Sequence, residues 1–151
     1  MITDKTGDSI ESKIDLGVHK NLSVEQEEYC FDIACYDEGA NLLINTKEQM
    51  FAEKLRSLLK FGPYSTRYKD VFDMCYLSDL VDRNRLMACM DTYIFNDTGM
   101  KECNMQDVRR RIQKTFGSDQ YIRNLTGSKK NWLETDASDV LRKLSSYLEA
   151  L

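Results

Sequence analysis

The 151-residue sequence has one histidine, one proline and one tryptophan, and its cysteines show no metal-binding pattern. No two cysteines have the Cys-x-x-Cys spacing, their number is odd, and His19 lies far from any cysteine pair. These absences argue against a zinc site or a disulfide framework, and they predict a reduced chain with buried thiols. The cysteines are Cys30, Cys35, Cys75, Cys89 and Cys103.

Targeting signals and excess positive charge are also lacking. The start, MITDKTGDSIESK, has no apolar run like that of a signal peptide. No later segment approaches the ~18 uninterrupted apolar residues of a membrane span. We therefore expect a cytoplasmic protein that does not enter a membrane. The net charge of −4 argues against a domain that holds nucleic acid mainly through its phosphates, because such domains are usually basic.

The length suits a single domain, which can bury roughly 68–70% of its unfolded surface without a staple. Strand signals lie between residues 12 and 44, where KIDLGV and YCFDIACY predict two or three strands. Asp37, Glu38 and Gly39 are typical of a turn after the second run. We expect residues 1–11 to be a flexible terminus.

From residue 45 onward the pattern is helical. Asn45 or Thr46 caps the first predicted helix, and Glu48 or Gln49 is placed to complete a capping box. A Gly-Pro pair at 62–63 ends this helix. The later predicted helices span residues 67–79, 83–95, 105–116, 119–125 and 136–148. The sequence therefore predicts an α+β fold, in which a short sheet precedes a bundle of about five or six helices.

The first predicted helix carries a lysine beside its apolar stripe. At ~100° per residue, Phe51, Leu55 and Leu58 share one face, and Lys54 falls at the edge of that face. A lysine in this position either extends its ammonium group into solvent or reaches along the core surface into a cleft. Helical spacing alone leaves both alternatives open.

The second predicted helix is apolar nearly all round, so its acidic residues need partners. Asp70 and Asp73 lie three residues apart and project from the same side. Together with Lys54, Arg67 and Lys69, these acids form either a structural ion-pair network or a site for phosphate and metal. In such a site lysine neutralises phosphate, and carboxylates hold the lysine or a divalent cation.

Two segments, NTKEQMFAEKLRSLLKFG and TRYKDVFDMCYL, resemble the C-terminal part of the AbiEii/AbiGii nucleotidyltransferase toxins of type IV abortive-infection toxin–antitoxin systems. The resemblance rests on an AEKL helix followed by a (K/R)DxxD helix, and it extends back to KIDLGV. It implies that residues 12–44 complete a nucleotidyltransferase-like mixed sheet and that residues 45–151 form a helical C-terminal region.

The resemblance also implies a metal site. In the nucleotidyltransferase superfamily three carboxylates bind two Mg²⁺ ions and direct a nucleoside triphosphate, here GTP or another, onto an acceptor. Asp15 in KIDLG matches the third carboxylate, which makes it the predicted metal ligand and a predicted catalytic residue. The alternative for Asp15 is an acid on the polar face of an edge strand.

Further site residues follow from the two helical motifs. By resemblance Lys54 is catalytic and contacts the nucleotide phosphates, with Arg67 and Lys69 as further nucleotide-binding residues. Asp70, the first acid of the (K/R)DxxD motif, is predicted to be catalytic. Asp73, the second acid, is predicted to support the site.

One departure from the family pattern concerns activity. The family's first two carboxylates come from an Asp-x-Asp motif, and this sequence contains none. Two-metal catalysis needs several carboxylates to hold ions ~3.5–4 Å apart. We therefore expect the C-terminal portion of a nucleotidyltransferase, inactive by itself.

Three functions stay open from the sequence. The first is a toxin portion that serves transfer of a nucleotide to an RNA (tRNA) or protein acceptor, countered by a separately encoded antitoxin that need not bind it directly. The second is a non-catalytic module of the same fold that binds a nucleotide or a partner. The third is an unrelated helical domain that binds nucleic acid through Arg109, Arg110 and Arg111, and such binding would weaken steeply with salt.

Overall fold

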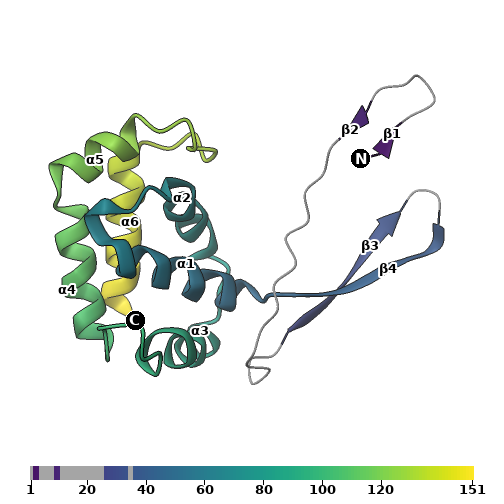
Figure 1. The fold of residues 1–151 in the computed structure, drawn as a ribbon, viewed down its shortest axis with the longest axis horizontal. Coiled ribbons are helices and arrows are strands. Elements are labelled where there is room, and N and C mark those ends of the chain that lie inside the picture. The colour runs from purple at the N-terminus through teal and green to yellow at the C-terminus, as the bar shows by residue number, and fades with distance from the viewer. Residues whose placement is uncertain (1, 4–8, 11–25, 34–35) are drawn as a thin grey trace.

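The computed structural model describes residues 2–3, 9–10, 26–33 and 36–151, which form two strand pairs and a bundle of helices (Figure 1). The strands are β1 (Ile2–Thr3), β2 (Ser9–Ile10), β3 (Glu27–Ile33) and β4 (Tyr36–Ile44). The helices are α1 (Lys47–Phe61), α2 (Tyr68–Leu77), α3 (Arg83–Met90), α4 (Met105–Phe116), α5 (Asp119–Thr126) and α6 (Ala137–Ala150), with short turns η1 (Gly62–Tyr64) and η2 (Asp91–Phe95). The predicted α+β class is confirmed.

Helix α1 begins at a predicted cap. Thr46 has an extended backbone, and its side-chain oxygen accepts a hydrogen bond from the Gln49 N–H at 3.1 Å. The Glu48 and Gln49 side chains, which were predicted to complete the capping box, have other partners. The Gln49 side chain donates to Glu53, and a Glu48 carboxylate oxygen accepts the backbone N–H of Asp82 at 2.9 Å, at the start of α3. The Glu48 carboxylate, which the local pattern assigned to the cap of α1, thus binds the start of α3 instead.

Helix α1 ends at Gly62, as predicted. Gly62 has φ 55°, a conformation that L side chains rarely adopt. A Cβ atom at Gly62 would lie 2.6 Å from the Arg111 guanidinium, which in turn donates to the Leu59 carbonyl at 3.0 Å. The positive φ therefore favours glycine here, and a Cβ atom would also displace the Arg111 guanidinium group.

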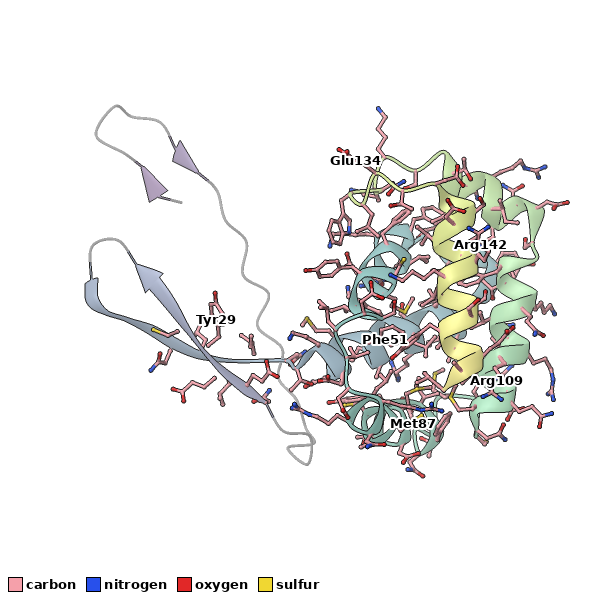
Figure 2. The ribbon with its side chains drawn as sticks, turned by 180° about the vertical axis from the view of Figure 1, so that it is seen from behind. Tyr29, Phe51, Met87, Arg109, Glu134 and Arg142 are labelled. Atoms are coloured by element: carbon pink, nitrogen blue, oxygen red, sulfur yellow. The ribbon has the colours of Figure 1, made fainter. Side chains whose placement is uncertain are left out.

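In the part of the chain that the structure describes, the core lies between the helices. Helix α1 packs against α2 and α3, while α6 packs against α2, α4 and α5. Figure 2 shows Phe51 in the interior of this bundle. Each helix contributes fully buried side chains, which include Phe51, Leu55, Phe72, Met74, Leu86, Val108, Tyr121, Leu125, Val140 and Leu144. None of the helices in the described part of the chain combines the length and apolar character needed to span a bilayer.

Strands β3 and β4 form an antiparallel hairpin that extends away from the helices (Figure 1). Tyr29 pairs with Leu42, and Glu28 pairs with Leu43. The prediction of a turn at residues 37–39 was wrong, because these residues belong to β4. The register shifts between Phe31 and Ile33, and this irregularity accommodates the extra residues of β4 without ending the strand. KIDLGV lies outside the described residues.

The other helix boundaries agree with the sequence to within a few residues, with one exception. The predicted helix over 83–95 stops being α-helical after Met90 and continues as a π turn, η2. The prediction of buried cysteines is confirmed for two residues and wrong for two others. Cys75 and Cys89 are buried as predicted, but Cys30 and Cys103 are exposed, since they lie on the projecting hairpin and in the loop before α4. β1 and β2 fall within residues 1–11, where no strand was predicted.

Candidate functional site

Lys54 joins α1 to α2 through two carboxylates. Its ammonium nitrogen lies 3.2 Å from Asp70 Oδ1 and 2.8 Å from Asp73 Oδ2. The Lys54 side chain is 23% exposed, and the two acids are 9% and 11% exposed. Of the two alternatives for Lys54, the structure thus selects the one in which it reaches along the core surface.

The two carboxylates accept further donors from α2 and its cap. Arg67, the N-cap residue of α2, places Nε 2.6 Å from Asp70 Oδ2. Lys69 lies one turn before Asp73 and contacts both of its oxygens, at 3.2 and 3.0 Å. Three cations and two acids therefore form one network, and this network brings together five of the six predicted site residues.

The electrostatics of the network favour the charged forms of Lys54 and Asp73. Burial by itself lowers the pKa of Lys54, but the hydrogen bond to Asp73 and the charges of Asp70 and Asp73 outweigh it, so the pKa lies above the ordinary 10.5. Burial by itself raises the pKa of Asp73, but hydrogen bonds from Lys54 and Lys69 outweigh it, so the pKa lies below the ordinary 3.8. Near neutral pH the site therefore presents a fixed ammonium group.

A cavity opens beside Lys54 on the side of α1. It has a volume of about 590 Å³, within the range of small-molecule sites. Its charged lining consists of four basic residues, Lys54, Arg56, Lys60 and Arg67, and two acidic residues, Glu53 and Asp97. Arg56 pairs with Asp97, with its Nε 2.7 Å from Asp97 Oδ2. The excess of basic side chains suits an anionic ligand.

The described carboxylates are a poor fit for a metal ion. Both oxygens of Asp70 and both oxygens of Asp73 already accept hydrogen bonds from cationic side chains. No group of three or more potential ligands for a metal occurs among residues 26–33 and 36–151 or the short strands before them. In this arrangement the two acids hold the Lys54 ammonium group in place.

Two other predictions have different outcomes. Asp15, the predicted metal ligand, lies outside the described residues. Two of the three consecutive arginines of α4 bind backbone carbonyls of other elements: Arg109 donates to Leu148 at 3.3 Å, and Arg111 donates to Leu59. Arg110 pairs with Asp107 on its own helix. Because two of the three guanidinium groups bind backbone oxygens, this patch gives little support to a nucleic-acid interface.

One member of the site was missed from the sequence. The indole N–H of Trp132, in the loop between α5 and α6, donates to Asp73 Oδ1 at 2.8 Å. The contact joins residues 59 positions apart, so no local spacing rule predicts it. The one available signal was the position of the chain's single tryptophan in a polar loop, GSKKNW.

The comparisons with known proteins give one match. A family model described as nucleotidyl transferase AbiEii toxin, type IV TA system, matches residues 3–139. The matched range includes α1, α2 and Trp132, and it ends within α6. No curated protein and no solved structure matches the chain.

Proposed function

The chain belongs to the family of AbiEii nucleotidyltransferase toxins of type IV toxin–antitoxin systems, and we propose that it holds the triphosphate of a nucleotide for transfer to an acceptor. In this proposal the Lys54 ammonium group contacts the phosphates, and Asp70 and Asp73 orient that ammonium group. Arg67 and Lys69 supply further positive charge at the same place. The substrate is GTP or another nucleoside triphosphate, and the acceptor is an RNA, such as a tRNA, or a protein.

The observation that carries the proposal is the position of Lys54. Its ammonium group is fixed by two carboxylates and lines a cavity whose charged residues are mostly basic. A preorganised cation needs no rearrangement when a phosphate arrives, and charge stabilisation of this kind is the main contribution of proteins to phosphoryl and nucleotidyl transfer. The network has three cations and two acids, so one positive charge stays uncompensated.

Transfer itself needs groups beyond those described. The sequence contains no Asp-x-Asp, and Asp70 and Asp73 are engaged by cations. We therefore propose that these 151 residues bind nucleotide but do not transfer it alone. Asp15 stays the proposed ligand of Mg²⁺, and a separately encoded antitoxin stays the proposed cellular partner, acting on expression without tight binding.

A second candidate is a non-catalytic module that binds a nucleotide or a partner. The same engagement of Asp70 and Asp73 favours it, because acids neutralised by three cations are suited to holding a ligand more than to activating an acceptor. The two candidates share the phosphate site, and they differ in whether transfer occurs once an Asp-x-Asp is supplied.

The proposal is tested with Lys54→Ala in a calorimetric titration with GTP and Mg²⁺. We expect at least a tenfold loss of affinity, because a charge-assisted contact to phosphate is worth about 1.5–3 kcal/mol. The matched control is Lys143→Ala, which removes an exposed lysine of α6 paired with Asp79 in the turn after α2. This control should leave GTP affinity unchanged.

The opposite result would assign Lys54 to stability alone. A marked fall in the melting temperature of Lys54→Ala with unchanged GTP affinity would mean that the network is structural. Where Lys54→Ala does weaken GTP binding, addition of a chain segment that carries an Asp-x-Asp separates the two candidates, since only the toxin portion should gain transfer.

A further inference from the structure

Trp132 is held at the network by a specific contact. Its indole N–H donates to Asp73 Oδ1, and its ring lies edge-on to that of Tyr76, with centroids 5.4 Å apart and an interplanar angle of 62°. The loop around it is braced by Asn131, whose side chain donates to the Thr135 carbonyl at 2.8 Å. Figure 2 shows Glu134 at the end of this loop, where its φ of 54° marks a sharp turn.

Both rings offer surface to solvent. Trp132 is 47% exposed and Tyr76 is 49% exposed. Exposure alone is not distinctive in this chain, because Phe61 and Tyr64 are exposed as well. What distinguishes the Trp132–Tyr76 pair is its bond to a carboxylate that also binds two ammonium groups.

The aromatic pair and the cations lie on one face of α2. Lys69, Asp73 and Tyr76 follow one another at intervals of four and three residues, which places them in a single stripe. The Lys69 ammonium group and the Trp132 indole contact the same Asp73 carboxylate. The cations of the network and the half-exposed aromatic pair are therefore adjacent, and the Asp73 side chain lies between them.

A ligand that fits this surface has negative charge at one end and a flat aromatic group at the other. A nucleotide has this construction, and bases stack on tryptophan and tyrosine whatever their identity. We propose that the ring of Trp132, held edge-on against Tyr76, is the stacking surface for the base of the nucleoside triphosphate whose phosphates contact Lys54. The inference rests on the proposed function, and it adds the residue that binds the base.

The test compares GTP with inorganic tripolyphosphate, which carries the charge but lacks the base. We expect Trp132→Leu to weaken GTP binding about fivefold or more, the range that loss of one stacked base produces. Tripolyphosphate affinity should stay within about twofold of the wild-type value, because the phosphate contacts come from lysine and arginine. Trp132→Phe keeps an aromatic ring and should restore most of the GTP affinity.

A spectroscopic signature accompanies the titration. Trp132 is the single tryptophan of the chain, so intrinsic tryptophan fluorescence reports this site alone. GTP should change the emission, and tripolyphosphate should change it much less at equal saturation. The control is Tyr64→Leu, which removes a 90% exposed ring outside the pair and should leave GTP affinity as in the wild type.

The outcomes separate the inference from the proposed function. Unchanged GTP affinity in Trp132→Leu overturns the stacking surface, and so does an equal loss for GTP and tripolyphosphate, which would mean that Trp132 acts only through Asp73. If neither probe binds the wild-type chain, both proposals fail. If Lys54→Ala changes nothing while Trp132→Leu selectively weakens GTP binding, the phosphate role of Lys54 fails and the stacking surface stands.

Discussion

The helical bundle and the β3–β4 hairpin place their apolar side chains in opposite environments. Phe51 and Phe72 are fully buried between helices, whereas Leu42 and Leu43 on the hairpin are 42% and 67% exposed. Six helices can surround a common interior, but a single two-stranded layer cannot cover either of its own faces. The stability of this protein should therefore come from the bundle.

The candidate site belongs to the stable region. Lys54 comes from α1, Asp70 and Asp73 from α2, and Trp132 from the loop before α6. Among the described contacts between the hairpin and the helices is an exposed ion pair between Glu27 and Arg85 of α3, 3.9 Å apart, and such pairs contribute little. The geometry of the site should thus depend on helix packing and be insensitive to changes in the hairpin.

The largest expected effect is the difference between core and hairpin substitutions. Phe51→Ala should lower the free energy of unfolding by about 3–5 kcal/mol, because it leaves a cavity beside Tyr147 in a filled core. Leu43→Ala should change the same quantity by less than about 0.5 kcal/mol. Urea unfolding followed by helical circular dichroism measures both. A comparable cost for Leu43→Ala would mean that hairpin and bundle unfold as one unit.

An intermediate effect is expected at the network. Asp73→Asn should lower the free energy of unfolding at pH 7 by about 1–3 kcal/mol, because Lys54 and Lys69 lose a charged acceptor. The pKa of Asp73 is lower in the folded than in the unfolded chain. Its contribution is therefore complete above the ordinary pKa of about 4 and is lost as pH falls through the folded value.

This pH dependence gives the measurement for Asp73. The difference between wild type and Asp73→Asn should shrink as unfolding is followed from pH 6 down to pH 3. The control is Asp79→Asn, which breaks an exposed pair with Lys143 and should cost less than about 1 kcal/mol. A difference that stays constant over this pH range would show that the charge of Asp73 is not what stabilises the fold.

The smallest effect should appear at the junction of the two regions. Thr46 follows the hairpin but caps α1, and it is only 2% exposed. Thr46→Ala should cost about 1 kcal/mol of bundle stability. Thr126→Ala, at the exposed end of α5, is the comparison and should change little. If Thr46→Ala leaves the free energy of unfolding unchanged, the cooperatively folded bundle begins after the first turn of α1.

The local parts of the fold could be read from the sequence because their causes are local. The cap at Thr46, the stop at Gly62 and the cap of α4 at Asn104 each depend on residues within one turn of the helix. The turn predicted at residues 37–39 failed for the opposite reason. Whether these residues turn or pair depends on the partner strand β3, which shifts register to accommodate them.

The candidate site likewise has residues that local sequence predicts and a residue that only a distant contact brings in. The motif spacing brought Lys54, Asp70 and Asp73 into one hypothesis, and the structure confirms that they meet. Motif spacing does not predict Trp132, because its contact with Asp73 exists only when the loop before α6 folds back on α2. The capping box at Glu48 failed similarly, since a distant backbone N–H was a better partner than the local one.

By itself the sequence determined the helices, most of their ends, the family and the charged residues of the candidate site, because each depends on residues that are close together in the chain. The tertiary structure alone decided how Lys54 is used, since its ammonium group could reach either solvent or the carboxylates until α1 packed on α2. It also decided that an aromatic pair borders the cations. Contacts between distant segments depend on how whole helices pack, and that packing minimises exposed apolar surface across the bundle as a unit.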